Sequence, residues 1–269
     1  WETDTGVVRL IDAMPPRDGH VDLIRRVEGV EGEVEMAMRW VVRFAYGKAI
    51  PWVRHVEDED GNEGLFALAG PDAVILRGDV LPEPDRRGGY GAHHTHFVVK
   101  AGEAVNSTLG WFASTDPIPN LHDPVEAIER TEQYWTGWSG RSTYQGPYAD
   151  AVQRSLITLK AMTYEPTGGI VAAPTTSLPE AIGGSRNWDY RFCWLRDATL
   201  VILALVAAAY FEEADEWRAW LLPAIAGSPA RLQILCGLGG APELPSHQFH
   251  WLAGYGRCAP WRARAAAAG

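Results

Sequence analysis

WLRDATLVILALVAAAYF, residues 194–211, predicts a helix that is apolar on every side between Ala198 and Ala209. A surface helix carries an apolar stripe on one side only, so this pattern indicates a helix that is surrounded by protein. Such a helix does not suit a two-layer arrangement, but it does suit the inner ring of a helical barrel. Arg196 and Asp197 fall in its first turn, at the expected mouth of the barrel. A negative charge is favoured there because a helix start exposes unpaired backbone N–H groups.

The segment that leads into this helix has an unusual mixture of side chains. Residues 183–200 contain two Trp, one Tyr, one Phe, three Arg and two Asp. A core segment avoids charge, and a solvated loop avoids so many aromatic rings. One interpretation is a buried Arg196–Asp197 ion pair that caps a core helix, since most buried ion pairs are structural. The other is a site that holds a polar ligand against a wall of rings. The residues alone favour the first and leave the second open.

The chain before this segment changes from a strand pattern to a helix pattern near residue 115. Apolar side chains alternate from Val34 to Phe44, which is the period of a half-buried strand. Similar stretches, separated by turn signals, cover residues 5–14, 65–80 and 96–114. Short strands joined by such turns favour an antiparallel sandwich. We expect its first strands to be missing from this chain.

Helices are expected in the second half of the chain. Asp123 can cap a helix that has Pro124 at its first position and ends near Trp138. Further helices are expected over 147–164, over 192–211 and over 212–226, where Pro223 should kink or shorten the last one. Residues 165–187 are rich in Gly, Pro, Thr and Ser and predict a long ordered loop.

Composition excludes several classes of partner. The formal net charge of −10 disfavours nucleic acid, because phosphate binding uses clustered Lys and Arg. The longest apolar run is shorter than the roughly 20 residues that a membrane span needs. Three widely spaced Cys suggest neither a disulfide framework nor a zinc site, so a reducing, cytoplasmic location is expected. The 12 Trp fit a large core, or a surface that stacks on sugar rings.

Two runs of residues carry a resemblance to a known family. They are GGIVAAPTTSLPE, residues 168–180, and RNWDYRFCWLRD, residues 186–197. Together they resemble bacterial glycoside hydrolase family 15, which includes glucoamylases and trehalases. Weaker similarity extends over most of the chain, for example at residues 14–18, 51–54 and 217–222.

The resemblance implies an all-β domain plus an all-α domain. The expected parts are a partial β-sandwich over 1–118, a linker helix over 119–146, the start of an (α/α)6 barrel over 147–255, and an atypical tail over 256–269. It also implies substrate-binding roles for four residues. Arg196 and Asp197 would hydrogen-bond the hydroxyls of a terminal glucose, and Tyr190 and Trp194 would form the pocket wall. Charged groups make the stronger hydrogen bonds, and rings pack on the sugar's C–H faces.

The catalytic residues of the family are not found in this sequence. Inverting hydrolysis of an α-glucoside needs a carboxylic acid and a carboxylate base. In the family both are glutamates on later barrel loops, and none in this chain matches them. The glutamates after Asp197 are Glu212, Glu213 and Glu216, expected on a solvated helix face, and Glu243 in a Pro-rich loop. Glu180 is expected to form a salt bridge or to be solvated. Trp188, Asp189 and Arg191 are expected to support the site or to pack.

The tail over 256–269 is rich in Arg and Ala and departs from the family. We interpret it as a shifted reading frame or a truncated gene, with a genuine short tail as the alternative. A helical barrel cut after its first helix pairs would lose much apolar burial, worth about 25 cal/mol per Å². We therefore expect a foldable β domain, a poorly packed helical part and no hydrolase activity from the chain alone.

Two functions follow from the sequence. The first is a fragment of an inverting hydrolase of the glucoamylase or trehalase type, whose partner is a maltooligosaccharide or trehalose. The second is a non-catalytic saccharide-binding or structural protein derived from such an enzyme. No cofactor or metal is expected: His93, His94 and His96 lack a nearby ligand partner, so a polar sheet face is favoured for them.

Overall fold

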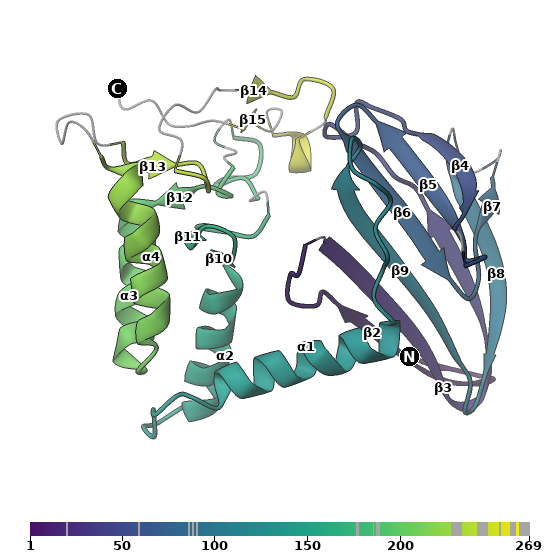
Figure 1. Cartoon of the computed structure of the whole chain (residues 1–269), viewed down its shortest axis with the longest axis horizontal. Helices are drawn as coiled ribbons and strands as arrows, with labels where there is room; N and C mark the ends of the chain where they lie inside the picture. The colour runs from purple at the N-terminus through teal and green to yellow at the C-terminus, as the bar shows by residue number, and fades with distance from the viewer. Residues whose placement is uncertain are drawn as a thin grey trace. The chain divides into compact units, whose positions relative to one another are not determined.

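The computed structural model describes two compact units, Trp1–Tyr134 and Trp135–Gly269. The residues it describes are 1–19, 21–58, 60–85, 87, 89, 91–175, 178–184, 186, 189–226, 233–240, 247–252, 254–258 and 262–263. A large antiparallel sheet is followed by helices, as the sequence predicts (Figure 1). The finer boundaries at residues 118, 146 and 255 stay predictions.

The first unit is built on antiparallel strands. They are β1 (Glu2–Thr3), β2 (Gly6–Ala13), β3 (Val21–Trp40), β4 (Trp52–Glu57), β5 (Glu63–Ala69), β6 (Asp72–Gly78), β7 (Glu83–Pro84), β8 (His93–Lys100) and β9 (Ala104–Ala113). The main path runs in the order β1-β2-β3-β9-β6-β5-β4, and β7 and β8 join through β3.

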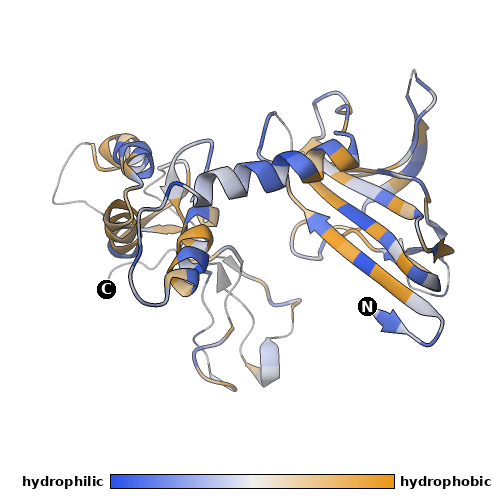
Figure 2. Ribbon diagram, turned by 90° about the horizontal axis from the view of Figure 1, so that it is seen from below, coloured by the Kyte–Doolittle hydropathy of each residue, from blue (hydrophilic) through white to orange (hydrophobic). Residues whose placement is uncertain are grey.

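The long strand β3 belongs both to the main path of the sheet and to the branch formed by β8 and β7. Its first half pairs with β9, and its second half pairs with β8, from Glu33 opposite Lys100 to Trp40 opposite His93. The alternation that predicts a strand from Val34 therefore marks only the second half of β3, and the strand ends at Trp40 rather than Phe44. Hydropathy also alternates along the neighbouring strands (Figure 2).

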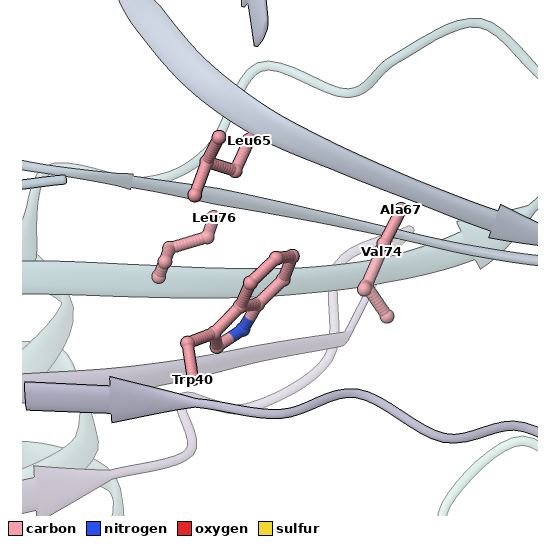
Figure 3. Close-up of a cluster of buried hydrophobic side chains, with 5 residues drawn as sticks. All are labelled: Trp40, Leu65, Ala67, Val74 and Leu76. Atoms are coloured by element: carbon pink, nitrogen blue, oxygen red, sulfur yellow. The ribbon is translucent and has the colours of Figure 1, made fainter. Parts of the chain in front are cut away.

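The core of the first unit lies where these two parts face each other. The indole of Trp40 packs with Leu65, Ala67, Val74 and Leu76 of β5 and β6 (Figure 3). A second cluster joins side chains of β2, β3 and β8 and contains Val8, Val27, Val34 and Val99. The inward positions of the strands therefore supply the apolar core, while some outward positions, such as those of Leu23, Trp52 and Val98, also carry large apolar side chains.

The segment that follows β9 is attached by hydrogen bonds to β3 and to the loop before it. The two ring nitrogens of His122 lie 2.7 Å from Asp22 Oδ2 and 2.9 Å from Asp18 Oδ2. The helix α1 (Pro124–Ser139) begins at the next turn. The carboxylate of Asp123 accepts the backbone N–H groups of Val125 and Glu126, each at 3.0 Å. The predicted cap of this helix is therefore confirmed.

The second unit contains helices joined by short strand pairs. The helices are α2 (Ala149–Ala161), α3 (Leu195–Ala207) and α4 (Phe211–Ala224), with a short 3-10 helix over Tyr255–Arg257. The strand pairs are β10 (Thr163–Tyr164) with β11 (Gly169–Ile170), β12 (Cys193–Trp194) with β13 (Leu235–Cys236), and β14 (His247–Gln248) with β15 (Arg262–Ala263). Pro223 lies in the last turn of α4, one residue before the helix ends at Ala224.

The helix α3 is buried on one side only, which differs from the sequence expectation. Ala198 and Leu205 are buried in the cores that α3 shares with α2 and α4. Leu200 and Leu203 are 61% and 60% exposed. Within this chain the helix is therefore not surrounded, because its apolar pattern exceeds what α2 and α4 cover, and this is the loss of burial that a barrel cut after its first helix pairs implies.

The turn between α3 and α4 has a left-handed residue that is not glycine. Ala209 has φ 72°, its N–H donates to the Val206 carbonyl at 3.0 Å, and the N–H of Tyr210 donates to the Leu205 carbonyl at 3.0 Å. These are the two bonds of a Schellman motif, in which glycine is the usual residue at this position.

We expect Ala209→Gly to stabilise the second unit by about 1 kcal/mol, because glycine removes the steric cost of the left-handed backbone. Thermal unfolding of the variant and of Ala207→Gly, a control inside the helix that should lose stability, measures the effect. A lower melting temperature for Ala209→Gly would show that the turn is not strained.

Candidate functional site

The start of α3 is held in place by a buried strand pair. Cys193 lies opposite Cys236 and Trp194 lies opposite Leu235 in β12 and β13. The N–H of Leu195 continues the pairing by donating to the Ile234 carbonyl at 3.2 Å. Both cysteines are free and buried, and burial raises the pKa of the Cys193 thiol to about 11. The thiols therefore stay protonated and serve packing.

The two aromatic residues that the resemblance assigns to a pocket wall, Tyr190 and Trp194, come from the same segment. The Tyr190 carbonyl accepts the N–H of Ala173 at 3.1 Å, and the Phe192 carbonyl accepts the N–H of Ala172 at 3.1 Å. The rings of Tyr190 and Trp194 lie 6.3 Å apart between centroids and are tilted by 35°. The structure thus brings together the two aromatic residues that the sequence assigns to the pocket wall.

Arg196 and Asp197 lie in the first turn of α3. Arg196 Nη2 donates to Asp197 Oδ2 at 3.1 Å, and the two side chains are 78% and 38% exposed. The interpretation as a buried pair that caps a core helix is therefore wrong, because both groups are open to solvent. Asp197 is nevertheless well placed for the helix dipole.

This arrangement can bind a neutral polyhydroxylated ligand. Arg196 offers donors and Asp197 offers acceptors, both outside the core, and charged groups form the stronger hydrogen bonds to hydroxyls. Tyr190 and Trp194 offer ring faces for apolar C–H groups. The roles of the four residues remain a prediction.

Comparison with known proteins places this segment in a family. A family model described as glycosyl hydrolases family 15 matches residues 146–256. A trehalase from Thermoplasma volcanium is 54% identical over 228 residues, covering 78% of this chain and 33% of that protein. A trehalase from Mycolicibacterium smegmatis is 30% identical over 287 residues, covering 97% of this chain and 42% of that protein.

Residues 146–256 of the chain belong to glycosyl hydrolase family 15. The resemblance carried by residues 168–180 and 186–197 is thereby confirmed. The chain spans less than half the length of the curated relatives it matches; even the trehalase 1 of Sulfolobus acidocaldarius, matched over 100% of this chain, is covered over 44%.

The other acidic residues of the helical unit differ in burial, and one of them differs from its expected position. Glu180 pairs with Arg186 at 3.1 Å, as expected. Glu212 and Glu216 are exposed, but Glu213 is buried at 3% exposure, so its expected solvated position is wrong. The physical reason is that Trp138, Arg141 and Lys160 surround its carboxylate. Trp188 and Glu243 lie outside the described residues.

Asp189 is expected from the sequence to support the site or to pack, and the structure places its side chain in the interior. It is buried at 3% exposure and binds Arg191 through both carboxylate oxygens. The spacing of an acid and an Arg two positions apart was the available signal, but the sequence does not reveal the burial.

The histidines of β8 form no metal site with the neighbours that the structure describes. His94 and His96 have ring centroids 4.4 Å apart, and His96 Nδ1 lies 3.5 Å from Glu35 Oε1. Over the described residues, no three His, Cys, Asp or Glu side chains gather closely enough to hold a metal ion. His93 differs from the other two because it is buried against Trp40.

Among the residues that the structure describes, no helix has the length and apolarity that crossing a membrane would require.

Proposed function

We propose that this chain supplies the hexose-binding segment of an inverting α-glucoside hydrolase, and that the substrate is trehalose. The observation that carries the proposal is the position of Tyr190, Trp194, Arg196 and Asp197 within the matched region, where the two charged groups are open to solvent and the two rings lie 6.3 Å apart between centroids. The relatives that cover this region are named trehalases, which favours trehalose over a maltooligosaccharide.

In this proposal the segment binds and orients the sugar. Arg196 and Asp197 hydrogen-bond the hydroxyls of one glucose, and Tyr190 and Trp194 pack on its C–H faces. The orientation exposes the glycosidic oxygen to an acid and the opposite face of the ring to a water, as inversion requires. The two catalytic glutamates would come from residues beyond those of this chain.

The helical unit also supports the finer fold proposal of an (α/α)6 barrel. Leu200 and Leu203 leave an apolar face of α3 uncovered, and a groove of about 350 Å³ lies between α2 and α3. Side chains that line the groove include Leu156, Leu159 and Ala204. Further barrel helices would bury this face, which is the arrangement that the all-round apolar pattern of α3 favours.

A titration with trehalose tests the proposal. With ¹⁵N-labelled Trp, the indole signal of Trp194 is expected to shift on addition of trehalose, and to shift less with maltose. Trp52 and Trp111, which are exposed on the first unit, are internal controls that should not move. A glucose-release assay on the same sample should show no hydrolysis. The proposal would be contradicted if the Trp194 indole signal did not shift at trehalose concentrations up to tens of millimolar, which is about the weakest range of specific binding.

A further inference from the structure

Asp189 is a buried carboxylate in the loop that leads to α3. Its Oδ1 accepts the backbone N–H of Arg191 at 3.0 Å and the Nε–H of the same residue at 3.0 Å. Its Oδ2 accepts Nη2–H of Arg191 at 3.0 Å. The guanidinium therefore binds the carboxylate in the bidentate fork geometry, which is the strongest form of this contact.

These hydrogen bonds between Asp189 and Arg191 close a tight turn with Tyr190 at its centre. Tyr190 lies between Asp189 and Arg191, so the contact restrains the backbone on both of its sides. The neighbouring segment adds the bonds from Ala173 to the Tyr190 carbonyl and from Ala172 to the Phe192 carbonyl, both 3.1 Å. The backbone of Tyr190 is thus held by the Asp189–Arg191 contact across it and by the hydrogen bond to its own carbonyl.

Burial distinguishes this ion pair from its neighbour in the same loop. Glu180 and Arg186 also pair, but their side chains are 41% and 72% exposed, whereas Asp189 is 3% exposed. An exposed pair contributes little and is easily exchanged for water. A buried carboxylate is costly to desolvate, and it becomes strongly destabilising when its partner is removed. The loop geometry therefore depends on the Asp189 pair and hardly on the Glu180 pair.

We propose that Asp189 is a positioning residue, which acts through Arg191 to fix the ring of Tyr190 beside that of Trp194. It shapes the wall on which a hexose packs and does not itself touch the sugar. The sugar part of this inference rests on the proposed function, but the ring positions do not.

The test compares Asp189→Asn, Arg191→Lys and the matched control Glu180→Gln with the unchanged chain. The first readout needs no ligand: nuclear Overhauser contacts between the labelled rings of Tyr190 and Trp194. We expect these contacts in the unchanged chain and in Glu180→Gln, and their loss in Asp189→Asn. Arg191→Lys keeps the charge but lacks the fork, so we expect weakened contacts. Far-ultraviolet circular dichroism checks that each variant is folded.

The second readout is the trehalose dissociation constant. We expect Asp189→Asn to raise it about tenfold, which is the effect of losing one charged hydrogen-bond system, and Glu180→Gln to leave it unchanged. If the folded Asp189→Asn variant keeps the ring contacts, or binds trehalose as the unchanged chain does, Asp189 is not a positioning residue. If the unchanged chain binds no trehalose, the proposed function fails, while the ring contacts still decide the role of Asp189.

Discussion

Replacing Glu213 by alanine is expected to lower the free energy of unfolding of the helical unit by about 3 kcal/mol, in the range seen when one partner of a buried ion pair is removed. The carboxylate accepts Trp138 Nε1–H at 2.6 Å and Arg141 Nη2–H at 3.1 Å, and it lies 3.3 Å from Lys160 Nζ. It therefore links the end of α1, the following loop, α2 and the start of α4. Without it, the buried Trp138 N–H loses its acceptor, and the largely buried Lys160 ammonium keeps only the longer contact, 3.7 Å, with Glu216 Oε2.

The adjacent glutamate provides a matched control. Glu212 Oε2 accepts Arg141 Nη1–H at 2.6 Å, but the Glu212 side chain is 77% exposed. Glu212→Ala should therefore cost less than about 1 kcal/mol, as exposed ion pairs do. Urea unfolding of both variants measures the difference. Equal losses for the two variants would mean that burial of Glu213 contributes nothing to the stability of the unit.

The same network makes a prediction for pH. Burial acts to raise the pKa of Glu213, but the hydrogen bond from Trp138 and the attraction of Lys160 outweigh it, so the pKa lies below its ordinary value. A carboxyl whose pKa is lowered by folding stabilises the protein above its unfolded pKa. This contribution should disappear as the pH falls through the lowered pKa, and Glu213→Ala should flatten the acid side of the stability profile.

The second large effect is expected at the start of α3. Asp197→Asn should weaken trehalose binding by about ten- to a hundredfold, because a carboxylate that accepts sugar hydroxyls contributes roughly 1.5–3 kcal/mol. The amide retains the shape of the side chain and can still accept hydrogen bonds at the helix start, so the fold should survive. Glu216→Gln, an exposed charge on α4, is the control and should bind normally.

Titration calorimetry and thermal unfolding of the two variants separate binding from stability. For Asp197→Asn we expect a weakened affinity for trehalose and a melting temperature close to that of the unchanged chain. Unaltered affinity in Asp197→Asn would remove Asp197 from the proposed site, whatever the family membership.

The parts of the fold that sequence could predict depend on local patterns. Asp123 followed by Pro124 marks the start of α1, since a cap and a first-turn proline act through neighbouring backbone groups. The alternation from Val34 marks a strand for the same reason. It could not show that β3 passes between two parts of the sheet, because pairing partners are distant in the chain.

The parts that sequence could not predict depend on distant contacts. Glu213 has the local signature of a solvated helix residue, and only the approach of Trp138 and Lys160 buries it. The burial of Asp189 was hidden in the same way, although its partner Arg191 is close in sequence. The apolar pattern of α3 indicates burial on every side. In this chain Ala198 and Leu205 are buried, whereas Leu200 and Leu203 face solvent.

The most direct test of sugar binding at the start of α3 is to locate bound trehalose by intermolecular nuclear Overhauser effects to the aromatic rings of the chain. We expect contacts from the sugar's C–H protons to both Tyr190 and Trp194, and weakening of these contacts in Asp197→Asn. Contacts only to exposed rings of the first unit, such as Trp52, or saturable binding with no contact to Tyr190 or Trp194, would contradict this expectation.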